Sequence, residues 1–162
     1  MLRRFILGAA VVCVFFALAG GARAAIVHFS ISLDGLQEVP PNNSPATGSG
    51  SAVLDTVSGL ITISGTYSGL LGTGEFGHLH GLAPAGANAP VIFDLTVGGG
   101  NFSGSGTLTP AQVTGALNLL TYVNIHTSLF PGGEIRGQLV PEPMAAWLLS
   151  FAPLALRYRR RG

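Results

Sequence analysis

The sequence predicts an all-β domain, an antiparallel, Greek-key-like β-sandwich or barrel of about eight short strands, with one short helix near residues 110–119. Apolar and polar residues alternate with a period of two in short segments: in residues 26–33, four apolar residues alternate with His28, Ser30 and Ser32. Segments rich in glycine, proline, serine and asparagine separate these runs. Short strands joined by such turns are typical of antiparallel sandwiches and barrels.

The expected elements follow from these signals in order. The strands span residues 26–33, 51–57, 60–67, 76–82, 91–97, 101–108, 121–127 and 134–139. Ser58 and Gly59 indicate a tight turn between the second and third strands. The prolines of residues 40–45 cannot join a central ladder and predict a loop. Thr109 as N-cap and Pro110 at the first helical position predict the helix that follows them.

The N-terminus has the pattern of a signal peptide. Two arginines precede an apolar run, residues 5–19, and a small-x-small pattern occupies residues 22–24. The run is shorter than the roughly 20 residues of a spanning helix, which disfavours the alternative of a retained membrane anchor. The sequence therefore predicts that residues 1–24 are a signal peptide, cut by signal peptidase between Ala24 and Ala25, and that the protein is exported.

The C-terminus, residues 141–162, has three parts. Pro141, Glu142 and Pro143 precede an apolar stretch, residues 144–156, and an arginine cluster. As a helix the stretch would cover only about 20 Å of a hydrocarbon core of about 30 Å. The order of the parts resembles the PEP-CTERM sorting signal of Gram-negative bacteria. The resemblance implies transient membrane association, processing by an exosortase, and delivery to the cell surface, outer envelope or extracellular matrix. An ordinary tail anchor is the alternative.

Between the two ends, residues 25–140 have the size of a single domain with an acidic charge balance. Six of the seven acidic residues but only one Lys or Arg residue, Arg136, lie here, which gives a net charge of −5 with neutral histidines. A domain without lysine cannot displace phosphate counterions, so nucleic acid and anionic lipid are excluded as charge-driven partners. The domain has no cysteine, which excludes disulfides and thiolate chemistry.

The histidines are the candidate metal ligands. His78 and His80 share one face of a strand, opposite Leu79, because side chains alternate along a strand. His126 lies on the corresponding face of a later strand, opposite Ile125. The three imidazoles either support loop carbonyls by hydrogen bonding, which is the favoured interpretation, or converge as a Cu or Zn site. A metal would also call for supporting carboxylates, for which the candidates are Glu75, Asp94 and Glu134. A His-x-His pattern on the outer face of a β-sandwich is also similar to copper–zinc superoxide dismutase, in fold and spacing alone.

Glu134 and Arg136 lie two residues apart on a predicted strand and therefore share a face. The expected interaction is an ion pair of small net energy. The alternative is a ligand-binding site in which Arg136 anchors a ligand carboxylate. The sequence has no G-x-S-x-G elbow, no H-E-x-x-H pattern and no carboxylate pair placed for glycoside hydrolysis. We therefore expect no enzymatic activity and no cofactor, with Cu or Zn as the alternative.

Three stretches together resemble the CHRD domain, which is named after chordin and also occurs in bacteria. They read LDGLQEVPP (33–41), GHLHG (77–81) and YVNIHTSLFPGGEIRGQL (122–139). The resemblance covers residues 25–140 and implies a β-rich extracellular domain. The expected function is a non-enzymatic binding or structural module at the cell surface or in the matrix, with extracellular polysaccharide or surface proteins as partners. A metal-binding or superoxide-dismutase-like redox protein is the alternative.

Overall fold

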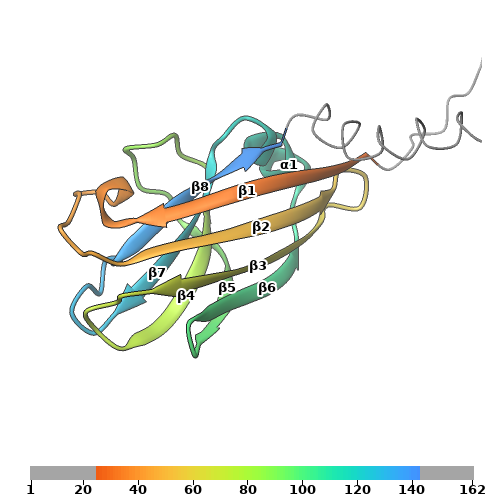
Figure 1. Cartoon of the computed structure of the whole chain (residues 1–162). Coiled ribbons are helices and arrows are strands. Elements are labelled where there is room, and N and C mark those ends of the chain that lie inside the picture. Colours follow the sequence, from red (N-terminus) through yellow and green to blue (C-terminus); the bar gives the residue numbers. More distant parts are fainter. Residues whose placement is uncertain (1–24, 143–162) are drawn as a thin grey trace, which may run out of the picture.

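The computed structural model describes residues 25–142, which form a closed antiparallel barrel of eight strands (Figure 1). The strands are β1 (Ile26–Asp34), β2 (Thr47–Asp55), β3 (Leu60–Ser68), β4 (Gly74–Gly81), β5 (Val91–Gly98), β6 (Asn101–Thr107), β7 (Thr121–Thr127) and β8 (Ile135–Pro141). A 3-10 turn, η1 (Gly35–Gln37), follows β1, and one short helix, α1 (Pro110–Leu117), precedes β7. The predicted all-β class is confirmed. Of the two predicted architectures, sandwich and barrel, the structure is a closed barrel.

The strand order around the barrel is β1-β2-β3-β6-β5-β4-β7-β8. Because β3 pairs with β6, the chain crosses over before it forms β4, and strands β3 to β6 make a Greek key. The helix lies in the second crossover, between β6 and β7. Thr109 caps it as predicted, with a reciprocal capping box to Gln112. Val113 and Ala116 of α1 join the buried core.

The predicted terminal signals lie largely outside the described residues. Residues 1–24 and 143–162 are not described, and they include the whole predicted signal peptide and most of the predicted sorting tail. β8 continues through Pro141, one residue past the expected domain end, and the Glu142 amide donates to the His28 carbonyl at 2.8 Å. Among the described residues, no helix is long and apolar enough to cross a membrane.

Inward-facing apolar side chains fill the barrel, and two glycines make room for the largest of them. The fully buried residues include Phe29, Ile61, Ile63, Leu79, Phe102, Val123, Ile125, Ile135 and Leu139. A Cβ at Gly50 would lie 2.7 Å from the Phe102 ring, and a Cβ at Gly65 would collide with the same ring. Gly50 lies in β2 and Gly65 lies in β3. The expectation that the second strand starts at residue 51 was wrong, because its glycine-rich first half, Thr47–Gly50, pairs in the barrel as well.

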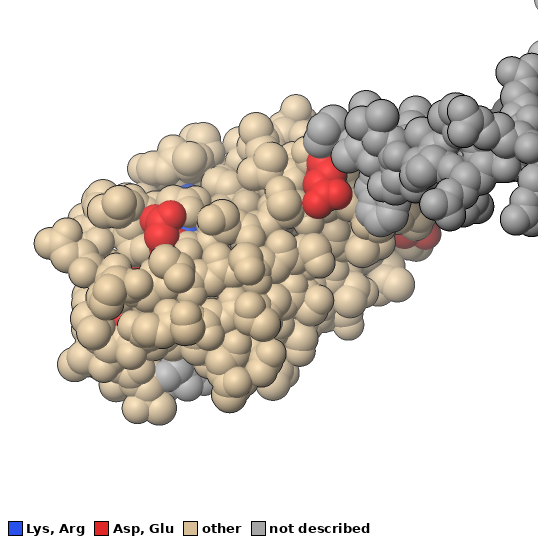
Figure 2. Space-filling view, in the orientation of Figure 1, with Lys and Arg blue, Asp and Glu red and all other residues tan. Residues whose placement is uncertain are grey.

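The outer face of β1, β2, β3, β6 and β5 carries exposed hydroxyl side chains. One row of hydroxyl side chains crosses five neighbouring strands in register, from Ser30 through Ser51, Ser64 and Ser103 to Thr96. Figure 2 shows this side as a mostly uncharged surface with a few acidic residues. The view has no basic patch, in agreement with the charge balance of the sequence.

The outer face of β4, β7 and β8 is different, because loops cover it. The loop after β4 and the loop after β7 fold back over these strands and supply backbone carbonyls to their side chains. As a result, His80, Asn124, His126 and Arg136 are buried although they point away from the barrel core. This covered polar layer contains the predicted metal ligands.

Candidate metal centre

His78 and His80 on β4 and His126 on β7 come together in the covered layer. Antiparallel pairing places His126 opposite Phe76 and Asn124 opposite His78, so the three imidazoles are neighbours on one face. One ring nitrogen from each lies within 4.8 Å of the others. The Nδ1 of His78 is 3.0 Å from the Nε2 of His126. Strand alternation predicted only that the rings share a kind of face, and the pairing of β4 with β7 brings the three of them together.

Backbone carbonyls fix which nitrogen two of these rings present to the cluster. The Nδ1 of His80 lies 2.9 Å from the Ala89 carbonyl, and the Nδ1 of His126 lies 3.0 Å from the Pro131 carbonyl. A carbonyl oxygen only accepts, so each Nδ1 carries the hydrogen and each Nε2 carries a lone pair. The lone pair of His126 lies 3.0 Å from the Nδ1 of His78, which can donate to it. The Nε2 of His80 is buried and has no hydrogen-bond partner. Holding the outer N–H on a carbonyl is how metal-binding histidines are commonly oriented.

His78 is the most exposed of the three and lies beside a carboxylate. Its Nε2 is 3.6 Å from Oδ1 of Asp94, which is directly opposite on β5 and 86% exposed. If His78 ligates through Nδ1, its Nε2–H points at this carboxylate, which then supports the ring from outside. Asp94 was one of the three carboxylates expected near the histidines. Glu134 binds elsewhere, and the side chain of Glu75 is not described.

Burial favours the neutral form of His80 and His126. His80 and His126 are only 8% and 7% exposed. Desolvation lowers the pKa of both imidazoles, and the neighbouring histidines lower it further. Neutral imidazole is the form that binds metal, so the two buried rings are ready to act as ligands near neutral pH.

The donor set suits Cu²⁺ or Zn²⁺. An ion about 2.0–2.1 Å from each nitrogen holds the three nitrogens about 3–4 Å apart. The observed upper limit of 4.8 Å requires a small inward movement of the rings. Three imidazoles without sulfur favour Cu²⁺ or Zn²⁺ and leave one coordination position open. Phe76, which is 46% exposed, lies against His78 and His126 at ring distances of 5.7 and 5.6 Å.

The expected ion pair between Glu134 and Arg136 was wrong. Glu134 precedes β8 and accepts hydrogen bonds from Ser44, Thr127 and the amides of Leu71 and Gly72. Desolvation alone would raise its pKa, but these four hydrogen bonds lower it below the usual value. The expectation placed Glu134 on the last strand, on one face with Arg136. Its position at the barrel end instead directs the carboxylate toward neighbouring loops.

Arg136 stacks on an aromatic ring instead of pairing with Glu134. Its guanidinium carbon is 3.4 Å from the centre of the Tyr122 ring. Its nitrogens donate to the Ala87 carbonyl, to Asn88 Oδ1 and to Gln138 Oε1 at 2.9, 3.3 and 3.2 Å. Desolvation lowers its pKa, and the electrostatic interactions with Tyr122 and Glu38 oppose this effect. These contacts occupy the side chain that the alternative interpretation had reserved for a ligand carboxylate.

Glu38 is a buried carboxyl that no sequence pattern marked as a site residue. It is 4% exposed, accepts from Asn124 Nδ2 at 3.4 Å, and has one oxygen without a partner. Burial raises its pKa from 4.5 to about 7, although the charge of Arg136 lowers it. Glu38 lies within the LQEVPP stretch, but nothing in local spacing predicts that the loop folds onto Asn124 and Arg136.

Glu38 should make stability fall as pH rises. The folded protein binds the Glu38 proton more tightly than the unfolded chain does. The resulting contribution of Glu38 to the free energy of unfolding is complete below about pH 4.5 and is lost as pH rises through about 7. The free energy involved is about 3 kcal/mol. We expect Glu38→Gln to gain stability relative to wild type between pH 5 and pH 8, as measured by urea unfolding at both values. Identical pH dependence in the two proteins would contradict the prediction.

The geometry defines a class of protein, a small closed β-barrel with a trihistidine cluster on its loop-covered outer face. A family model described as the CHRD domain matches residues 29–139, so the chain belongs to the CHRD domain family. The resemblance noted from the three sequence stretches is thereby confirmed. No curated protein and no solved structure matches the chain significantly.

Proposed function

We propose that this protein is an exported, non-enzymatic CHRD module that binds one Cu²⁺ or Zn²⁺ ion through His78, His80 and His126. The observation that carries the proposal is the buried, unpartnered Nε2 of His80, which faces two further imidazoles. A buried polar atom without a partner costs about 1–3 kcal/mol. A metal ion would satisfy this atom and the lone pair of His126 together.

A purely structural role explains less of the geometry. Hydrogen bonds to Ala89 and Pro131 account for one nitrogen of His80 and one of His126. The second nitrogen of His126 also has a partner, because it lies 3.0 Å from the Nδ1 of His78. Hydrogen bonding does not account for the second nitrogen of His80, which is buried, has no partner and is turned toward the other two rings. The family assignment supports a domain of this kind but names no ligand.

Copper is the favoured ion. For nitrogen donors, affinity rises toward Cu²⁺ and falls again at Zn²⁺. The domain contains no cysteine, so it lacks the soft thiolate ligands that select Cu⁺. The proposal therefore concerns Cu²⁺ first and Zn²⁺ second.

Metal titration of the purified protein tests the proposal. We expect one Cu²⁺ per chain by elemental analysis after desalting and a lower dissociation constant for Cu²⁺ than for Zn²⁺. Mg²⁺ and Ca²⁺, which prefer oxygen ligands, should bind weakly. A protein that retains no Cu²⁺ or Zn²⁺ above a buffer blank would leave only the structural role of the histidines.

Export and sorting belong to the same proposal. The signal-peptide pattern and the Pro-Glu-Pro tail support delivery to the cell surface or matrix, where extracellular polysaccharide or surface proteins are the expected partners. N-terminal sequencing of the protein recovered outside the cytoplasm should begin at Ala25. Recovery there with Met1 intact would contradict the signal peptide.

A further inference from the structure

We infer that Arg136 is a positioning residue for the metal centre, which it serves by clamping the loop after β4 against Tyr122 so that this loop orients His80. The inference rests on the proposed function. It adds a residue that does not bind the metal itself but holds the loop that contacts one of the ligands. It assigns a role to the only Lys or Arg side chain among residues 25–142.

The first link joins Arg136 to the loop. One guanidinium nitrogen donates to the Ala87 carbonyl at 2.9 Å and another to Asn88 Oδ1 at 3.3 Å. The next residue, Ala89, supplies the carbonyl that holds the Nδ1 of His80. The arginine therefore fixes the two residues that precede the support of the ligand.

The second link runs through Tyr122. Its ring is stacked on the His80 ring at 4.8 Å with an interplanar angle of 3°, and the Arg136 guanidinium lies on the same phenol ring. β7 lies between β4 and β8 in the barrel, so imidazole, phenol and guanidinium follow one another across three strands. The Tyr122 hydroxyl also accepts from the Ala89 amide at 3.0 Å. Tyr122 and Arg136 thus hold His80 and its supporting loop from two directions.

The burial of Arg136 supports a role in holding the loop after β4. The residue is 1% exposed and forms no ion pair with a carboxylate within the described residues. Removing a charge from water is costly unless hydrogen bonds and close contacts compensate for it. Here the compensation comes from the loop after β4, from Gln138 and from the face of Tyr122. The buried charge therefore holds the loop whose Ala89 carbonyl contacts His80.

Four variants of the purified protein separate positioning from general stability. Arg136→Met removes the clamp, and Arg136→Lys keeps the charge but cannot reproduce the planar, several-donor contacts. Tyr122→Phe keeps the stacked ring and removes only the hydroxyl contact to Ala89. Gln138→Leu is the matched control, because it removes a contact of Arg136 that does not involve the loop.

The two readouts are Cu²⁺ dissociation constants, from competition with a chelator, and the number of nitrogen ligands, from electron paramagnetic resonance. Arg136→Met should weaken Cu²⁺ binding about 10–100-fold, the usual effect of removing a residue that orients a ligand, and should change the copper spectrum. Arg136→Lys and Tyr122→Phe should show smaller losses in the same direction, and Gln138→Leu should resemble wild type. A merely destabilised but folded variant would keep the wild-type copper spectrum.

Two results would overturn the inference, and they differ. If wild type binds neither Cu²⁺ nor Zn²⁺, the proposed function fails and the inference fails with it. If wild type binds Cu²⁺ and the folded Arg136 variants bind it with the same affinity and spectrum, the inference alone fails. Should Arg136→Met not fold, Arg136→Lys and Tyr122→Phe decide the question by the same two measurements.

Discussion

Replacing His80 with alanine should remove most of the stabilisation of this protein by Cu²⁺ or Zn²⁺. An ion that binds only the folded state stabilises it by about 2.7 kcal/mol at a free concentration one hundred times the dissociation constant. For a domain of this size, that corresponds to a rise in melting temperature on the order of 10 °C. His80 supplies the buried free nitrogen of the cluster, so His80→Ala leaves two ligands and loses most of this gain.

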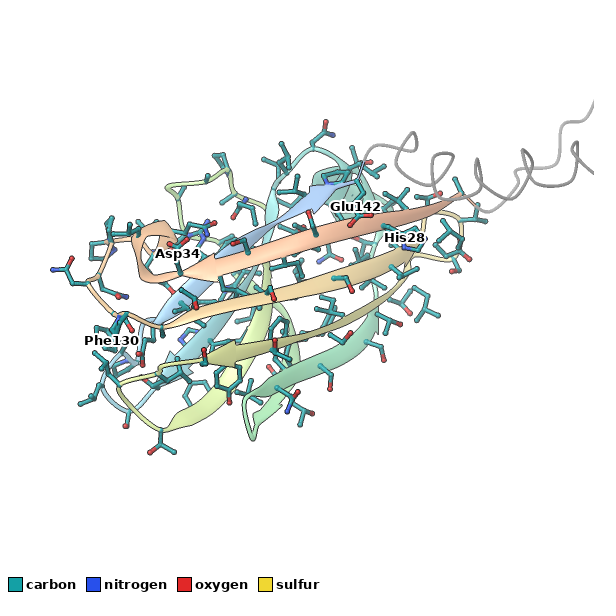
Figure 3. All side chains as sticks on the ribbon, in the orientation of Figure 1. His28, Asp34, Phe130 and Glu142 are labelled. Atoms are coloured by element: carbon teal, nitrogen blue, oxygen red, sulfur yellow. The ribbon has the colours of Figure 1, made fainter. Side chains whose placement is uncertain are left out.

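Calorimetry of wild type and His80→Ala, each with excess metal and with EDTA, measures the effect. His28→Ala is the control, because His28 is far from the cluster. It lies beside Glu142 at one end of the barrel, and Phe130 lies at the other end (Figure 3). Phe130 precedes Pro131, whose carbonyl contacts His126. His28→Ala should keep the full metal-dependent difference, whatever its own stability. If EDTA does not change the wild-type melting temperature and His80→Ala lowers it with and without metal, His80 has a structural role only.

The faces of the strands could be predicted because alternation is local. Leu79, Val123 and Ile125 are all fully buried in the barrel, and the histidines on the opposite parity share the outer face. The capped helix and the turn at Ser58 could be predicted for the same reason, since caps and turns depend on a few consecutive residues. The convergence of the histidines required in addition that β4 and β7 pair, which sequence order alone does not determine.

The covering of that outer face could not be predicted. His80 and His126 are buried by loops whose paths depend on contacts between distant segments. The stack of Arg136 on Tyr122 has the same origin. The guanidinium contacts the loop after β4 and the Tyr122 ring, and both contacts depend on segments far from Arg136 in the sequence.

Replacing Glu134 with alanine should cost this domain more stability than replacing any of the three histidines. Its carboxylate is fully buried and accepts hydrogen bonds from Ser44 Oγ, from Thr127 Oγ1 at 2.7 Å and from the Leu71 amide at 2.7 Å. These donors come from three separate segments, so the carboxylate joins the loop before β2 and the loop after β3 to the end of β7. Glu134→Ala removes the acceptor of four donors, of which the Thr127 hydroxyl is buried and the other three are partly buried. A buried donor left without an acceptor costs about 1–3 kcal/mol. We expect the free energy of unfolding to fall by about 3–5 kcal/mol.

Urea unfolding at pH 7 measures this loss, and Glu134→Gln separates charge from shape. The amide keeps the size of the side chain but has one accepting oxygen in place of two, so its loss should be about half that of alanine. Asp94→Asn is the control for removing an acidic charge, because Asp94 is largely exposed and should change stability by less than about 0.5 kcal/mol. The hydrogen bonds of Glu134 go to loops and to Thr127 and not to the histidines, so Cu²⁺ affinity should be unchanged in Glu134→Gln. A loss below about 1 kcal/mol in Glu134→Ala would mean that water replaces the carboxylate at this end of the barrel.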